Sequence, residues 1–124
     1  MTYRIKNTPI VVSGHFDVVD DDMVIEFKTV ASTKYVSKPH WQHVMQANFY
    51  AYCEGLEKIL LVYVDLSSVK TFPLQVNPSL IEILENRAID LHRAVLDDVP
   101  PRTGVVEDWE CRLCDFAEEC EESK

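Results

Sequence analysis

The sequence predicts an α/β domain in which a small mixed β-sheet is flanked by helices and followed by a cysteine-containing tail. Residues 10–19 and 23–30 are rich in Val, Ile and Phe and are separated by three aspartates, which is typical of two strands joined by a turn. Residues 58–65 form a nearly continuous apolar run, as expected of a strand covered on both faces. Residues 41–54 and 77–96 carry helical signals. The expected order is therefore strand, strand, helix, strand, strand, helix.

The helical signals lie at the ends of the first helix and along the second. Ser37 is a candidate N-cap for the first helix and Gly55 follows its last turn. In the second helix, Leu and Ile residues recur at helical spacing, which predicts an apolar face toward the sheet. Between the helices, Pro73 marks residues 69–76 as an edge strand. We expect Asp65 to cap the turn before that strand; a role as a further metal-site acid is the weaker alternative.

Length and composition predict one domain that is not a membrane protein. The chain has 124 residues, and we expect residues 1–99 to form its core and residues 100–124 its tail, after the Pro-Pro break. No apolar run reaches the length of a membrane span and no signal peptide is recognisable, so we expect a soluble, cytoplasmic protein. The net charge of −9 argues against indiscriminate DNA binding. Residues 27–53 nevertheless contain three lysines and no acid, so this stretch carries +3 and the rest −12.

The first hairpin brings acidic groups together. Glu26 and Lys28 share one face of their strand, since strand side chains alternate. A two-residue loop at residues 21–22 would place Asp17 opposite Glu26 and His15 opposite Lys28. Two carboxylates about 5 Å apart destabilise a sheet unless a cation lies between them, and hard oxygen ligands favour Mg²⁺ or Mn²⁺. A lysine there can orient or deprotonate a water and stabilise phosphoryl charge. The alternative is a surface hairpin with an ordinary Glu/Lys pair.

The following helix adds a polar stripe to this pattern. Gln46 and Tyr50 are four residues apart and therefore share a helical face, and His43 and Cys53 extend the same stripe. In order along the chain, the motifs are Gly-x-x-Asp, Glu-x-Lys, Gln-x-x-x-Tyr and a cluster of three cysteines. They are formed by Gly14 and Asp17, Glu26 and Lys28, Gln46 and Tyr50, and Cys111, Cys114 and Cys120. With these motifs the chain resembles the PD-(D/E)xK nuclease superfamily, and within it the RecB-like branch that includes the CRISPR-associated Cas4-like exonucleases.

The resemblance implies a restriction-endonuclease-like core with metal-dependent nuclease activity. It implies that Asp17, Glu26 and the backbone carbonyl of Phe27 hold Mg²⁺ or Mn²⁺, and that Lys28 assists the attacking water. Gln46 and Tyr50 would position the metal-site groups and the DNA strand. The implied substrate is single-stranded DNA, often cut exonucleolytically, in CRISPR adaptation and antiviral defence or in recombination and phage replication.

Relatives of this kind carry a helical segment before the Gly-x-x-Asp strand, with a metal-binding His and a first cluster cysteine. We expect this chain to begin after that segment. His15 is then the candidate further metal ligand, and a strand histidine without metal contact is the alternative. The segment containing Cys111, Cys114 and Cys120 suits a [4Fe-4S] cluster, which the resemblance favours, or zinc. The fourth ligand would be Cys53, a histidine, solvent or a cysteine of another chain; a tail without metal is the remaining option.

Basic and aromatic residues between the second strand and the first helix are candidate DNA contacts. They are Lys34, Lys38, His40 and Trp41, beside Tyr35. Lysines that follow phosphates and rings that stack on bases are what single-stranded nucleic acid requires. The alternative places the aromatics in the core, where we expect Phe49 and Tyr52. Homodimerisation is a further expectation. Two rival functions remain: a nuclease-like binding or scaffold module acting with a partner protein, and a structure-specific or restriction endonuclease.

Overall fold

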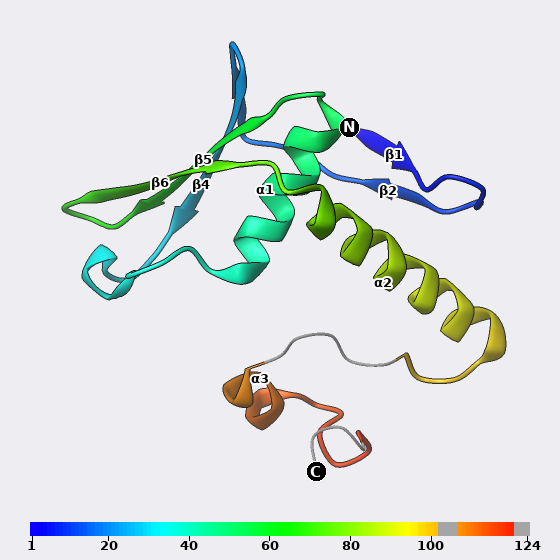
Figure 1. Cartoon of the computed structure of the whole chain (residues 1–124). Helices are drawn as coiled ribbons and strands as arrows, with labels where there is room; N and C mark the ends of the chain where they lie inside the picture. Colours follow the sequence, from blue (N-terminus) through cyan, green and yellow to red (C-terminus); the bar gives the residue numbers. More distant parts are fainter. Residues whose placement is uncertain (102–106, 121–124) are drawn as a thin grey trace. The chain divides into compact units, whose positions relative to one another are not determined.

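The structure, a computed structural model, describes residues 1–101 and 107–120. The chain forms two compact units, Met1–Glu85 and Asn86–Lys124, whereas the sequence suggested a division at residue 99. Figure 1 labels most of the elements along the chain. Their bounds are β1 Thr2–Arg4, β2 Val11–Ser13, β3 Val18–Asp20, β4 Met23–Thr29, a 3-10 helix η1 Thr33–Tyr35, α1 Trp41–Cys53, β5 Lys58–Val64, β6 Val69–Gln75, α2 Pro78–Asp97 and α3 Asp108–Leu113.

The first unit is built on a mixed four-stranded sheet in the order β3-β4-β5-β6. The central strands β4 and β5 are parallel and are connected by α1, which makes a β-α-β unit, while both outer pairs are antiparallel. A parallel pair needs such a crossover because its strands run in the same direction. The predicted α/β class, with a mixed sheet and helices, is confirmed. The edge position predicted for the Pro73 strand is also confirmed, since among the described strands β6 pairs with β5 alone.

The first predicted strand is wrong in its extent. Instead of one strand over residues 10–19, the chain forms β2 and β3, and β2 pairs with β1 in a separate two-stranded sheet. Residues 14–17 leave the ladder between them because Gly14 lies against the Tyr50 ring and Asp17 bonds to β4 through its side chain. The strand β1 was not predicted because the first nine residues lack periodicity.

The predicted hairpin register is confirmed where β3 pairs with β4. Val18 is paired with Ile25 and Asp20 with Met23, which is the register that a two-residue loop at Asp21 and Asp22 imposes. Asp21 has φ 43°, in the left-handed region that short aspartate side chains tolerate. Continued by one residue, this register brings Asp17 opposite Glu26.

Helix α1 packs on the face of the sheet formed by alternate residues of β4 and β5 (Figure 1). Phe49 is buried as predicted, but Tyr52 is 41% exposed, so its placement in the core was wrong. His40 occupies the N-cap instead of Ser37, and the helix is closed as predicted by Gly55 at φ 70°. Buried Asn48 donates to the Val44 carbonyl and accepts from the backbone N–H of Asn77, which ties α1 to the residue that precedes α2.

The second unit contains the later part of α2 and the short helix α3. Glu107 and Glu110 form a capping box at the start of α3, in which each side chain accepts from the other residue's backbone N–H. None of the helices in the described ranges has the length and apolar character needed to span a membrane.

Candidate functional site

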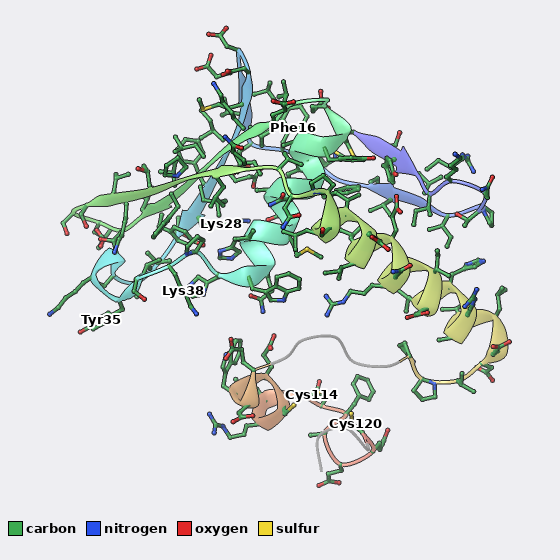
Figure 2. The ribbon with its side chains drawn as sticks, in the orientation of Figure 1. Phe16, Lys28, Tyr35, Lys38, Cys114 and Cys120 are labelled. Atoms are coloured by element: carbon green, nitrogen blue, oxygen red, sulfur yellow. The ribbon has the colours of Figure 1, made fainter. Side chains whose placement is uncertain are left out.

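The centre of the candidate site is the α1-facing side of β4. Glu26 and Lys28 both lie on this face, with Phe27 between them on the opposite one, as predicted from strand alternation. Glu26 is only 2% exposed, which is unusual for a carboxylate. Lys28 reaches from β4 toward α1 (Figure 2), and its Nζ lies 3.9 Å from Glu26 Oε2.

Asp17 joins this pair through two hydrogen bonds that replace strand pairing. Its backbone N–H donates to Glu26 Oε1 at 2.9 Å, and its Oδ2 accepts from the Phe27 N–H at 2.9 Å. The N–H and C=O of one strand residue point to the same side of the strand, so the Phe27 carbonyl faces the same open edge of β4. The two carboxylates and the carbonyl named in the sequence analysis are therefore neighbours.

Helix α1 adds the polar stripe predicted for it. Lys28 Nζ donates to Gln46 Oε1 at 2.5 Å, and Gln46 Nε2 donates to the Tyr50 hydroxyl at 3.1 Å. A Cβ added to Gly14 would lie 2.7 Å from Tyr50 Cε1, closer than a side chain tolerates. Glycine is thus required at this position by the close approach of the tyrosine ring. The six residues of the first three motifs are therefore linked to one another by hydrogen bonds, an ion pair and the close approach of Gly14 to Tyr50.

Burial sets the electrostatics of the site. The pKa of Glu26 is raised above its ordinary value, first by burial and further by the charge of Asp17; the backbone N–H of Asp17 and the charge of Lys28 oppose the rise. A carboxylate in this position is therefore costly when it is ionised without a compensating cation. Removing that cost is what a bound divalent cation would do.

The donor set fits a small hard cation that takes few protein ligands. Two carboxylates and one carbonyl leave the rest of an octahedral shell to water and substrate, which is typical of Mg²⁺. Within residues 1–101 and 107–120, no three His, Cys, Asp or Glu side chains are close enough to hold a metal ion. Among these residues, His15 therefore does not complete a three-residue ligand group with Asp17 and Glu26.

A second polar group lies beside Lys28 and was only partly anticipated. The Tyr63 hydroxyl accepts the His40 backbone N–H at 3.0 Å and is hydrogen-bonded to His43 Nδ1 at 2.8 Å. The register of the parallel strands places Tyr63 next to Lys28 on the same face. The sequence analysis placed His43 on the polar stripe of α1. It did not predict a polar role for its partner Tyr63, because Tyr63 lies in the apolar run of residues 58–65.

The loop between β4 and α1 carries the candidate DNA contacts. Lys34, Tyr35, Lys38 and His40 are exposed, Tyr35 to 80%, and Trp41 is partly buried. Figure 2 shows the Tyr35 and Lys38 side chains directed outward from this loop. Lys34 Nζ lies 5.6 Å from the centre of the Tyr35 ring, a cation–π contact.

Asp65 anchors this loop. It accepts from the backbone N–H groups of Thr33, Ser67 and Ser68, and these bonds hold its pKa far below the usual range. The turn-capping role preferred for Asp65 is confirmed. The loop therefore starts from a fixed point, while its basic side chains remain exposed.

The four cysteines fall in different settings. Cys111 belongs to α3, Cys114 caps its C-terminal end and Cys120 lies beyond the following turn (Figure 2). Cys114 Sγ accepts the Phe116 N–H at 3.4 Å. The cluster or zinc site expected of these three cysteines has no assembled ligand group in the described part of the chain. Cys53 is partly buried in α1, and burial raises the pKa of its thiol to about 11, as expected of a packed helix thiol.

Comparison with known proteins supports the fold and goes no further. No family model matches the chain, and no curated protein matches it. A solved structure described as the crystal structure of SSO0001 is similar, with a TM-score of 0.66 and 24% identity. The alignment covers 100% of this chain and 57% of that one, so the chain spans little more than half the length of that structure. At this identity the likeness shows that the two chains share a fold.

Proposed function

We propose that the protein is a Mg²⁺- or Mn²⁺-dependent DNA nuclease of the PD-(D/E)xK kind, related to the RecB-like and Cas4-like exonucleases. The observation that carries the proposal is the unbroken series of contacts from Asp17 through Glu26, Lys28 and Gln46 to Tyr50. These residues come from separate elements, and a sheet-and-helix core has no structural need for a buried acid beside a second acid.

Each residue has a role that follows from its position. Asp17, Glu26 and the Phe27 carbonyl would hold the cation, which when bound would supply Lewis-acid stabilisation of phosphoryl charge. Lys28, fixed by Gln46 Oε1, is placed to orient the attacking water and to stabilise developing negative charge. Water oxygen bonds to phosphorus and loses a proton to solvent, the P–O bond to the leaving sugar breaks, and the leaving oxygen takes up a proton from solvent.

Single-stranded DNA is the substrate that the surface favours. Exposed Lys34, Lys38 and Tyr35 lie on the loop that runs from β4 into α1, between the two elements that carry the site. A net charge of −9 leaves such a local basic surface as the main source of phosphate affinity. Exposed rings beside lysines suit unpaired bases, which offer their faces for stacking.

Cleavage of labelled single-stranded DNA tests the proposal. The wild-type protein with Mn²⁺ should cut the strand, and chelation with EDTA should stop it. Glu26→Gln and Lys28→Ala should each lower the rate by at least about 100-fold, as expected when a group that acts in the transition state is lost. The exposed residues Glu82 and Lys6 supply matched controls, Glu82→Gln and Lys6→Ala. Equal cleavage by all variants would place the activity in another site or in a contaminant.

A binding module acting with a partner protein is the second candidate, favoured by the small number of side-chain ligands at the acid pair. Such a module has no requirement for a metal at Asp17 and Glu26. Saturating Mn²⁺ should raise the melting temperature of a nuclease and leave that of a binding module unchanged, because a ligand of the folded state stabilises it by mass action. Single-stranded DNA binding that is indifferent to Mn²⁺ and to Glu26→Gln would favour the module.

A further inference from the structure

The hydrogen bonds of Tyr63 determine which nitrogen of His43 carries a proton. The Tyr63 side chain is fully buried, and its hydroxyl accepts a hydrogen bond from the His40 backbone N–H at 3.0 Å. The hydroxyl has one proton of its own, and His43 Nδ1, 2.8 Å away, is the acceptor that the structure provides for it. His43 Nδ1 is therefore unprotonated, and Nε2 carries the N–H.

The opposite assignment leaves a buried donor without a partner. If Nδ1 donated, the hydroxyl would receive two donors, and its own proton would have no acceptor in a site closed to water. Leaving a buried donor unsatisfied is costly, and no buried side-chain N or O among the described residues lacks a partner. The neutral Nε2–H form of His43 follows from this count.

Two independent relations place His43 beside the candidate catalytic group. On α1 it precedes Gln46 by three residues, so both side chains lie on one face of the helix. On the sheet, its partner Tyr63 is in register with Lys28, the residue that bonds to Gln46. The imidazole thus extends the stripe of Gln46 and Tyr50 by almost one turn toward the start of the helix and the basic loop.

We propose that His43 is a substrate-binding residue that donates its Nε2–H, as a neutral group, to a non-bridging oxygen of a DNA phosphate next to the Asp17–Glu26 site. The proposal rests on the nuclease function proposed above and adds a substrate contact to it. Its role differs from that of Lys34 and Lys38, which attract the strand by charge. A neutral donor that is fixed by Tyr63 selects the position of one phosphate.

The surroundings of His43 favour its neutral form. Burial, the charge of Lys28 and that of His40 all lower its pKa, in that order of importance. The groups that face it are Tyr63 from β5, Lys28 from β4 and His40 from its own helix end; His40 and Tyr63 also contact its ring. A second cation next to Lys28 would be repelled by it, whereas a neutral N–H adds a hydrogen bond without that cost.

Two substitutions separate this role from a purely structural one. In His43→Asn, the amide oxygen can take the place of Nδ1 and accept the Tyr63 hydroxyl, but no donor reaches the position of Nε2. In His43→Gln, the longer side chain brings an amide N–H to that position. If His43 only accepts the Tyr63 hydroxyl, Asn should preserve DNA binding. If His43 donates to a phosphate, Gln should preserve DNA binding and Asn should not.

The first measurement is the tautomer. Nitrogen chemical shifts of the ¹⁵N-labelled wild-type protein should show protonated Nε2 and unprotonated Nδ1 for His43 at pH 7.5. The opposite tautomer would overturn the inference without bearing on the nuclease proposal. Tyr63→Phe removes the hydroxyl proton, so it should increase the population of the other tautomer.

The second measurement is binding of a labelled single-stranded oligonucleotide in Ca²⁺, by fluorescence anisotropy, with cleavage in Mn²⁺ alongside. His43→Asn should raise the Kd and KM about two- to tenfold, the range for one hydrogen bond, and His43→Gln should restore most of the loss. The dependence of log Kd on log salt should keep its slope in both variants, while Lys38→Ala should reduce it by about one. His92→Asn is the matched control in the second unit.

The possible results distinguish failure of the His43 inference from failure of the nuclease proposal. Cleavage by the wild type with an unchanged Kd and KM in His43→Asn overturns the His43 inference and leaves the nuclease proposal standing. A reduced salt slope in His43→Asn also overturns it, because the contact would then be charged. A wild type that binds DNA but does not cut it overturns the nuclease proposal; weaker binding by His43→Asn would still support the phosphate contact. A wild type that does not bind DNA overturns both.

Discussion

Replacement of Glu26 by glutamine should stabilise the protein when no metal is present. The side chain is 2% exposed and lies beside a second carboxylate. Glutamine has nearly the same shape and keeps Oε1 as acceptor for the Asp17 N–H. The change removes the charge, and with it the ion pair between Oε2 and Lys28 Nζ at 3.9 Å, which offsets part of the gain. Relief of a like-charge contact in a sheet is worth about 1 kcal/mol. For a chain of this size, that corresponds to a rise of about 3–6 °C in melting temperature.

The stability difference between Glu26→Gln and the wild type should depend on pH, in a direction set by the pKa shift of Glu26. Burial raises the pKa of Glu26 in the folded protein above its unfolded value. Folding therefore favours the protonated form of Glu26. The contribution of this form to the free energy of unfolding is fully present below the pKa of Glu26 in the unfolded chain and is lost as pH rises through its pKa in the folded protein. The advantage of Glu26→Gln should be absent near pH 4, grow as pH rises through the folded pKa and stay constant above it. Thermal unfolding in EDTA from pH 4 to 8 measures it, with exposed Glu82→Gln as control.

Metal should reverse this order. At a Mn²⁺ concentration of about 100 times its Kd, the wild type should gain about 2.7 kcal/mol, whereas Glu26→Gln should gain much less because one ligand charge is gone. The wild type is then the more stable of the two. A Glu26→Gln protein that is less stable than the wild type in EDTA at pH 7.5 would refute the reasoning, because the buried carboxylate would be making contacts worth more than its cost.

Three further predictions concern the surroundings of the site. Gly14→Ala should displace the Tyr50 ring, lower the free energy of unfolding by about 1–3 kcal/mol and reduce cleavage, as denaturant titration and the DNA assay will show. Asn48→Leu should cost about 1–3 kcal/mol in the same titration, because the backbone N–H of Asn77, which precedes α2, loses its acceptor. Burial raises the pKa of Cys53 to about 11 from 9.0, which lowers its thiolate fraction at pH 8 by about 100-fold, so it should be alkylated well after exposed Cys114; mass-spectrometric mapping that finds them equally reactive would contradict this.

The sequence predicted those parts of the fold that depend on local pattern. Apolar runs and end signals located β4, α1, β5, β6 and α2 to within a few residues. The loop of Asp21 and Asp22 set the hairpin register, because its length leaves one pairing. These features need only neighbouring residues for their explanation.

What was missed depends on residues far apart along the chain. The break at residues 14–17 arises because the Tyr50 ring lies against Gly14, which no pattern within the strand indicates. Buried Asn48 reads as an ordinary helix residue until its acceptor role toward Asn77 is seen. Tyr63 reads as one more apolar residue of a buried strand, and its hydroxyl acquires a role only through His40 and His43.

The break in the first strand also explains how the acidic pair is held. If the pairing of β3 with β4 continued past Val18, Asp17 would take a regular strand position. Backbone hydrogen bonds would then occupy the edge of β4 at Phe27. Because the chain leaves the ladder after Gly14, the Asp17 carboxylate itself takes the Phe27 N–H, and its backbone N–H turns to Glu26. The carboxylates are thereby fixed by backbone donors instead of by each other. In the proposed function, two like charges held in this way are preorganised for a cation, so their cost without metal is the most direct test of that proposal.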